Sequence, residues 1–139
     1  MAVLNSTLYT NVYVNKYITS AMDRGGRAVP IPFQHTVGAD TTADTVNLCV
    51  IPANCEVVGL DMSNDACGGT CTLALGDSGS ASRFLAATSV AAAGKLSGLL
   101  SAGMLYRPTL DTIVFGTWAS TNPTAAAVIK GVLWVIPGV

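Results

Sequence analysis

Hydrophobic and polar residues alternate along most of the chain after residue 43, in short runs separated by turn-forming residues. In the run 45–51, Val46, Leu48 and Val50 share one face, and the run 56–62 repeats the pattern with Val58, Leu60 and Met62. Alternation with a period of two residues is typical of a strand that has one face in a protein core. The pattern therefore predicts a series of short strands between residues 45 and 136.

Turn signals separate these runs. They are the Pro-Ala-Asn triplet at 52–54, the Asn-Asp pair at 64–65, the Gly-Gly pair at 68–69 and the sequence GDSGS at 76–80. Short strands with turn signals every 8–12 residues are typical of an antiparallel β-sandwich or a small barrel. No helical segments alternate with the strands, as a βαβ fold requires. The expected fold class is all-β, an antiparallel β-sandwich.

Two segments of this region depart from simple alternation. In the last run, 126–136, Ile129, Leu133 and Val135 share one face, and the other face is also apolar: Val128, Val132, Trp134 and Ile136. A strand that is apolar on both faces should be central or covered on both sides. The Ala-rich stretch 91–100 contains two glycines and its pattern is ambiguous; a loop that contains a single helical turn is one interpretation.

The pattern of residues in the first 42 positions differs from that in the rest of the chain. It predicts an extended N-terminal arm (1–42) before the sandwich body (43–139). Segment 8–18 fits a strand or a short helix, because Tyr9, Tyr13 and Tyr17 share a face in either. Segment 23–33, DRGGRAVPIPF, is predicted to lack regular structure, because its glycines and prolines interrupt helices and strands.

The arm nevertheless carries apolar and aromatic side chains that are costly to leave in water. Tyrosine is also enriched at protein interfaces. We therefore expect the arm to fasten the body to a neighbouring subunit through these residues: Tyr9, Tyr13, Tyr17, Val29, Ile31 and Phe33. The alternative is an arm that folds back on its own sandwich.

Composition points to an assembled protein. Charged residues make up 11% of the chain and hydrophobic residues 50%, whereas an average soluble domain is about 25% charged. A monomer with so few charged residues has little charged surface to keep it in solution. We expect other copies of the chain, or another partner, to cover much of the surface.

Charge and hydropathy also exclude some partners. The seven Lys and Arg residues are scattered, so no basic run exists to bind nucleic acid. The most apolar stretch, 84–106, has Lys95 at its centre, so no membrane span is expected. The N-terminus lacks the basic start and apolar stretch of a signal peptide. The thiols are therefore expected to be made in a reducing cytoplasm.

Few residues have the pattern of a chemical site. The single histidine, His35, lies in a proline-flanked segment and is expected to be a packing or surface residue. The sequence GDSG at 76–79 matches a serine-protease motif but has no plausible His–Asp partner arrangement, and we interpret it as a turn capped by Asp77. No enzymatic activity, metal or cofactor is expected.

Two further groups of residues leave alternatives open. Cys49, Cys55, Cys67 and Cys71 are interpreted as small buried apolar residues, with a zinc site or a Cys67–Cys71 disulfide as alternatives. A sugar-binding sandwich should expose an aromatic ring beside carboxylates or amides. Trp118 with Asn122 is the one candidate pair, and Trp134 is expected in the core.

Three stretches together resemble the small β-sandwich decoration, or cement, proteins of tailed-bacteriophage capsids. They are DTVNLCVIPANCEVVGL (44–60), LGDSGSASRFLAA (75–87) and GVLWV (131–135). The resemblance implies a jelly-roll-like sandwich without enzymatic activity, forming a homotrimer on the outside of an icosahedral head. Such a protein bridges major capsid subunits, belongs to the virion surface and is assembled in the host cytoplasm. The alternatives are another virion part, such as a tail, fibre or head-fibre module, and a small lectin-like sandwich.

Overall fold

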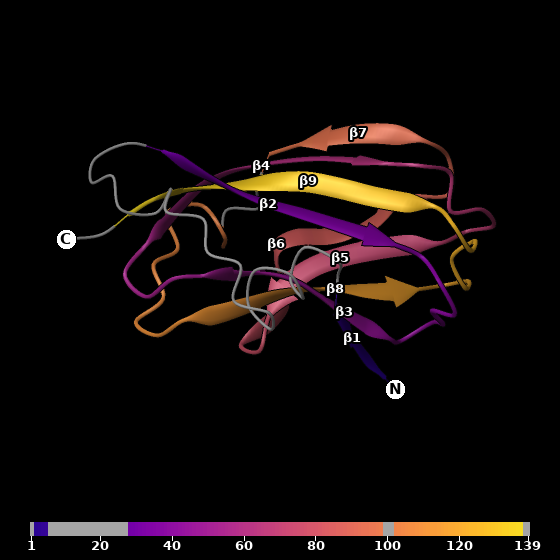
Figure 1. The fold of residues 1–139 in the computed structure, drawn as a ribbon, viewed down its shortest axis with the longest axis horizontal. Coiled ribbons are helices and arrows are strands. Elements are labelled where there is room, and N and C mark those ends of the chain that lie inside the picture. The colour runs from indigo at the N-terminus through magenta and orange to yellow at the C-terminus, as the bar shows by residue number, and fades with distance from the viewer. Residues whose placement is uncertain (1, 6–27, 99–101, 138–139) are drawn as a thin grey trace.

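The computed structural model describes residues 2–5, 28–98 and 102–137 of the 139. The described residues form nine strands and no helix, packed as two sheets in a sandwich (Figure 1). The expected all-β sandwich is confirmed. The strands are β1 (Val3–Asn5), β2 (Val29–Thr36), β3 (Thr45–Ile51), β4 (Glu56–Asn64), β5 (Thr72–Asp77), β6 (Ser80–Ser89), β7 (Gly94–Ser97), β8 (Thr112–Ala119) and β9 (Val128–Ile136).

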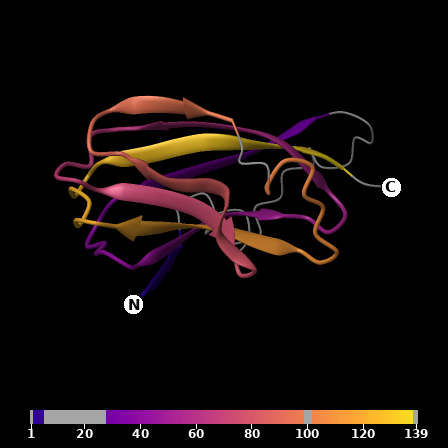
Figure 2. The same cartoon turned by 180° about the vertical axis from the view of Figure 1, so that it is seen from behind.

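The two sheets differ in strand number and order. The five-stranded sheet has the order β1-β3-β8-β5-β6, and the four-stranded sheet has the order β2-β9-β4-β7. Strand neighbours are antiparallel except β1 and β3, which are parallel. Seen from behind in Figure 2, β5 and β6 continue the lower sheet and β7 borders the upper one.

The core lies between the sheets and is built from the inward residues of every long strand. Its largest fully buried side chains are Trp118, Phe84, Ile51, Leu73, Leu75, Ile129 and Leu133. Gly131 of β9 pairs with Phe33 of β2. A Cβ atom on Gly131 would lie 2.7 Å from Cζ of Phe33. The missing side chain therefore leaves the space that the phenyl ring fills.

Strand β2 corrects the prediction for segment 23–33. Residues 29–33 are regular: β2 pairs with β9 along all eight of its residues. Pro30 and Pro32 are tolerated because β2 is an edge strand and both side chains point away from the core. Val29, Ile31 and Phe33 point inward, with 5%, 5% and 2% of their surface exposed. These three expected interface residues thus pack into the chain's own core, which is the alternative stated for the arm.

The expected boundary at residue 42 does not separate an arm from a body within the described residues. Strand β1 pairs with β3 in one sheet, and β2 pairs with β9 in the other. Residues 2–5 and 28–42 therefore belong to the sandwich. Tyr9, Tyr13 and Tyr17 lie outside the described residues, and their interface role stays a prediction.

Two predictions about the later strands have different outcomes. In residues 91–98, the part of the Ala-rich stretch that the structure describes, a short strand, β7, pairs with β4 at the sheet edge, and no helical turn is present. Strand β9 is central in its sheet, as its two apolar faces predicted, because it lies between β2 and β4. In the part of the chain that the structure describes, no helix is long and apolar enough to span a membrane.

Candidate interaction surfaces

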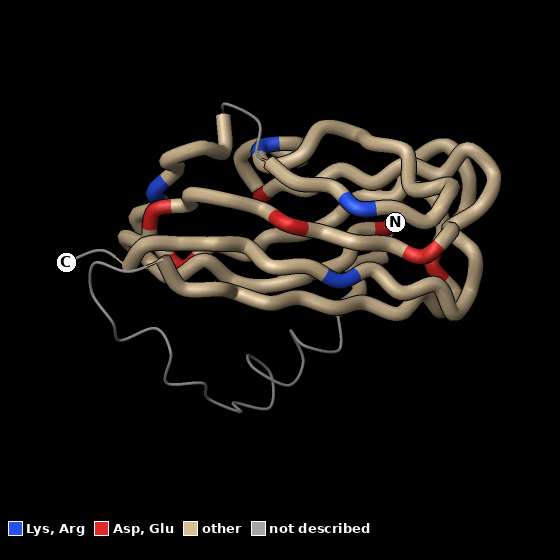
Figure 3. The backbone as a smooth tube through the Cα atoms, turned by 90° about the horizontal axis from the view of Figure 1, so that it is seen from above, with Lys and Arg blue, Asp and Glu red and all other residues tan. Residues whose placement is uncertain are grey.

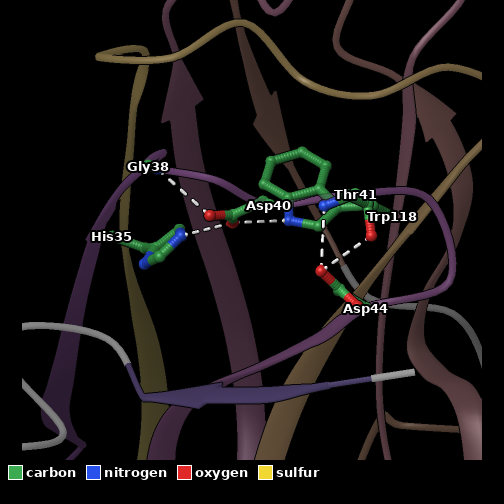
Figure 4. Close-up of polar contacts among 6 residues, drawn as sticks. All are labelled: His35, Gly38, Asp40, Thr41, Asp44 and Trp118. Carbon is green, nitrogen blue, oxygen red and sulfur yellow. Dashed lines mark hydrogen bonds and ion pairs between the residues drawn. The ribbon is translucent and has the colours of Figure 1, made fainter.

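The one histidine belongs to a buried polar network that ties the two sheets together (Figure 4). Nε2 of His35 lies 2.7 Å from Oδ2 of Asp40, and the same oxygen accepts a 3.0 Å hydrogen bond from Nε1 of Trp118. The other carboxylate oxygen accepts a 3.1 Å bond from the N–H of Gly38. His35 is 7% exposed, as its expected packing role requires. The network fixes the loop between β2 and β3.

Asp44 closes the same loop and holds the start of the chain. Its Oδ2 accepts hydrogen bonds from the backbone N–H and the hydroxyl of Thr41, at 2.9 and 3.0 Å. Its Oδ1 accepts a 3.0 Å bond from the N–H of Ala2, just before β1. The backbone N–H groups of Ala2 and Thr41 stabilise the carboxylate and lower the pKa of Asp44.

The sequence GDSG forms a hairpin turn between β5 and β6, as predicted. Oδ1 of Asp77 accepts hydrogen bonds from the N–H groups of Gly79 and Ser80, at 3.0 and 2.9 Å. Its Oδ2 lies 2.8 Å from Nε of Arg83, whose guanidinium stacks 4.2 Å above the Tyr106 ring. Among the described residues, these contacts of Asp77 and Arg83 hold the turn in place.

The four cysteines are free thiols buried in the sandwich, as the small-apolar interpretation predicted. Burial raises the pKa of Cys49 to about 12 and that of Cys67 to about 11. Such thiols stay protonated and unreactive at neutral pH. Among the described residues, no group of three His, Cys, Asp or Glu side chains is arranged to hold a metal ion.

The outward face of the four-stranded sheet carries an open groove of about 630 Å³. Figure 3 looks onto this face and shows acidic and basic positions spread along its strands. The strand register arranges the outward residues in rows across the sheet. One row is Gln34–Lys130–Ser63–Lys95, the next is Pro32–Val132–Asp61–Ser97, and the third is Pro30–Trp134–Gly59. From the first row to the third, the outward side chains therefore change from cationic to apolar.

The two tryptophans occupy positions opposite to those expected. Trp118 is 1% exposed and belongs to the core. Trp134 lies on the outward face, partly exposed, with its indole N–H donating a 3.1 Å bond to Oδ2 of Asp61. A Cβ atom on Gly59 would lie 3.4 Å from Cδ1 of Trp134, so the ring rests on the bare backbone of β4. Lys130, four residues earlier on β9, is the sequence signal that marks this side as outward.

A second surface is the apolar loop 102–111 between β7 and β8. Met104, Leu105 and Leu110 are 44%, 61% and 75% exposed there. Leu105 has a positive φ of 62°, a conformation that costs a non-glycine residue roughly 1–2 kcal/mol. Its N–H donates to the carbonyl of Val57 at 2.8 Å, and the N–H of Val57 donates to the carbonyl of Tyr106 at 2.9 Å. These two hydrogen bonds fix the backbone around Leu105, and its side chain is exposed to solvent.

The outward side of the five-stranded sheet is uncharged. The only charged residues in its strands are Asp77 and Arg83, which pair with each other. The half-buried positions on the side away from the core are small, polar or aromatic: Thr45, Asn47, Thr72, Ala74, Phe115 and Thr117. A face without charges avoids the desolvation cost of covering it with another protein surface.

Three solved structures with a similar fold come from phage capsids. No family model matches the sequence, and a comparison with curated proteins finds no match. A chain in the capsid of Ralstonia phage GP4 matches with a TM-score of 0.76 and 21% identity, over 99% of both chains. A chain in the cyanophage Pam1 capsid asymmetric unit matches with a TM-score of 0.66 and 26% identity, over 87% of this chain and 99% of that one.

A third structure extends the comparison. A chain in the acid-stable capsid of Helicobacter pylori bacteriophage KHP30 matches with a TM-score of 0.58 and 15% identity, over 83% of this chain and 92% of that one. At these identities the likeness is one of fold. The alignments cover 99%, 99% and 92% of the three matched chains.

Proposed function

We propose that this protein is a structural component of a bacteriophage virion that binds the outside of an icosahedral head and stabilises it by bridging major capsid subunits. The observation that carries the proposal is the fold match over 99% of both chains with a chain of the Ralstonia phage GP4 capsid. The two chains are similar in length, so a small sandwich of this kind can serve as a separate capsid chain.

The surfaces of the chain support a role in assembly. The outward side of the five-stranded sheet has no unpaired charge in its strands, and the loop 102–111 presents Met104, Leu105 and Leu110 to solvent. Exposed apolar side chains held on a fixed backbone lose little conformational freedom when they are buried by a partner. Leu105 is the side chain that we expect to anchor the contact with the shell.

We further propose that the chain acts as a homotrimer on the virion surface, assembled in the host cytoplasm. The low content of charged residues, 11%, fits a chain whose surface is partly covered by its own copies. Tyr9, Tyr13 and Tyr17 are the residues proposed to fasten one subunit to the next or to the shell. No catalytic role is assigned, because the polar networks around Asp40, Asp44 and Asp77 hold loops and turns.

The test is capsid binding. Purified protein is added to phage heads that lack it, the heads are sedimented, and the bound particles are imaged. The proposal expects ordered density on the outer surface that spans neighbouring shell subunits. The variant Leu105→Asp should bind much more weakly, whereas Ala87→Asp, at an exposed site on β6, should bind as the wild type does. Density confined to the tail, or no binding, would reject the proposal.

The oligomeric state is tested separately. Sedimentation equilibrium at micromolar concentration should give three times the 14.2 kDa mass of the chain. A stable monomer at that concentration would contradict the homotrimer and leave the capsid-binding test unaffected.

A further inference from the structure

The groove on the four-stranded sheet has charges that the described part of the chain leaves unpaired. Lys130 and Lys95 are exposed on its walls, and neither forms an ion pair within the described residues. Asp61 lies in the next row and is already engaged by Nε1 of Trp134 and by the hydroxyl of Ser97, at 3.1 and 2.8 Å. Asp65, beyond the lysine row, accepts from the N–H of Val128 at 3.0 Å. The two ammonium groups are therefore available to an anion.

The strand register sets the size of a ligand that can use this face. Neighbouring strands lie about 4.8 Å apart, so Lys130 and Lys95, with Ser63 between them, are separated by about 10 Å across the sheet. Lys130 and Trp134 are four residues apart on β9, about 13 Å along the strand. A ligand of two to three linked rings would reach from the indole to the lysines.

The apolar end of the face presents a flat ring in a fixed position. Trp134 rests on the backbone of Gly59, and its indole N–H is held by Asp61. Pro30 and Pro32 stand exposed on the neighbouring strand and extend the apolar surface. An immobilised ring offers its free side to a ligand with little loss of side-chain entropy.

We propose that this groove, together with the Trp134 row that lies beside it on the same face, binds an acidic oligosaccharide. The C–H face of one pyranose ring stacks on Trp134, hydroxyl groups exchange hydrogen bonds with Asp61, Ser97 and Gln34, and a sugar carboxylate lies between Lys130 and Lys95. A charged hydrogen bond to a carboxylate is roughly twice as strong as a neutral one, so the acid group supplies selectivity. This activity is separate from capsid binding and needs only the isolated protein.

The groove fits other classes of partner less well. The core of a protein interface is depleted in lysine and other charged residues, whereas the two central strands of this face carry Lys130 and Asp61, and Lys95 lies on the adjoining edge strand β7. Nucleic acids bind through many phosphate contacts, and two lysines neutralise only two. A ring platform beside a carboxylate, hydroxyl, amide and two ammonium groups matches the mixed apolar and polar faces of an acidic sugar.

The test is a glycan array followed by calorimetry. The array carries uronic-acid and sialic-acid oligosaccharides beside their neutral methyl-ester or desialylated counterparts, together with acidic peptides. The proposal expects at least one acidic oligosaccharide to bind with a dissociation constant below about 1 mM, at least about tenfold tighter than its neutral counterpart. Binding should weaken as salt is added.

Two variants and one control decide the site. The double variant Lys95→Gln with Lys130→Gln should lose at least about tenfold in affinity for the acidic ligand and little for the neutral one. Trp134→Leu should weaken both, with folding checked by circular dichroism. Arg107→Gln, at an exposed cation outside the groove, should bind as the wild type does. Binding by no acidic glycan, binding by acidic peptides alone, or equal affinity in the lysine variant would overturn the proposal.

Discussion

The indole N–H of Trp118 donates a 3.0 Å hydrogen bond to Oδ2 of Asp40, although the two residues are 78 positions apart in the chain. Trp118 lies on β8 of the five-stranded sheet, and Asp40 lies in the loop that follows β2 of the four-stranded sheet. With His35 on the same carboxylate, this contact joins both layers of the sandwich through one buried side chain.

The first prediction follows from that carboxylate. Asp40→Ala leaves the buried indole N–H and the imidazole of His35 without their acceptor, and each unsatisfied buried group costs about 1–3 kcal/mol. We expect the free energy of unfolding, measured in urea, to fall by about 3 kcal/mol. Glu56→Gln is the control, because its contact with Arg107 is exposed and 3.4 Å long. A variant as stable as the wild type would contradict the role of Asp40.

The second prediction concerns acid stability. The folded-state pKa of Asp44 is lowered by the N–H groups of Ala2 and Thr41, so the carboxylate stabilises the fold above its unfolded pKa of about 3.9. That contribution is lost as the pH falls below this value and through the lower folded pKa. Unfolding free energies of wild type and Asp44→Asn should therefore converge on acidification from pH ~5. Parallel curves would count against this assignment.

The third prediction concerns the thiols. Because burial raises the pKa of Cys49 to about 12 and of Cys67 to about 11, the native protein should react very slowly with a thiol reagent at pH 8. Adding urea should expose all four thiols and restore the rate of a model peptide. Rapid labelling of the native protein would show that these side chains are accessible.

The fourth prediction uses a pair of glycines. Gly131→Ala would place a Cβ atom 2.7 Å from the Phe33 ring and 2.5 Å from the carbonyl oxygen of Asp61, so a backbone shift is required. We expect a loss of about 1–3 kcal/mol in unfolding free energy. Gly38→Ala is the matched control, because no atom lies within 4 Å of its added Cβ. Equal stability of the two variants would show that the space at Gly131 is not needed.

The fifth prediction separates interface tyrosines from core residues. Replacing Tyr9, Tyr13 and Tyr17 together by Ala should weaken oligomer assembly or capsid binding without changing the unfolding free energy of the monomer. Phe33→Ala should instead lower that free energy by about 3–5 kcal/mol, because Phe33 is 2% exposed. A truncation at residue 41 cannot make this distinction, since it removes β2. Unchanged assembly in the tyrosine variant would exclude the proposed fastening role.

The sequence pattern predicts the strands, but it predicts only in part which face of each strand is buried. Val58 was predicted to share a face with Leu60 and Met62, whereas the structure buries Val57, Leu60 and Met62. The register shifts between Val57 and Gly59, and an irregularity of this kind reverses the parity of all residues before it. A similar shift between Asn47 and Cys49 buries Cys49 beside Leu48. Alternation alone does not reveal where a strand gains a residue.

The sequence does not predict the candidate sugar-binding face, for two physical reasons. The sequence predicts Trp134 in the core, whereas the structure places it on the outward side of β9 with Lys130. Its carboxylate partner Asp61 comes from a different strand, 73 residues away, so the pair depends on sheet topology. The prolines of β2 predict an interruption of regular structure, because a sequence does not show which strands will lie at a sheet edge, where proline is tolerated.

Those prolines have a consequence for the protein at high concentration. The free edge of a sheet offers N–H donors to which a strand from another molecule can add, and repeated addition leads to fibres. Proline has no N–H group, so Pro30 and Pro32 remove two donors from the outer margin of β2 without disturbing its pairing with β9. Newly made chains can therefore accumulate in a crowded cell before assembly with less risk of polymerising through this margin.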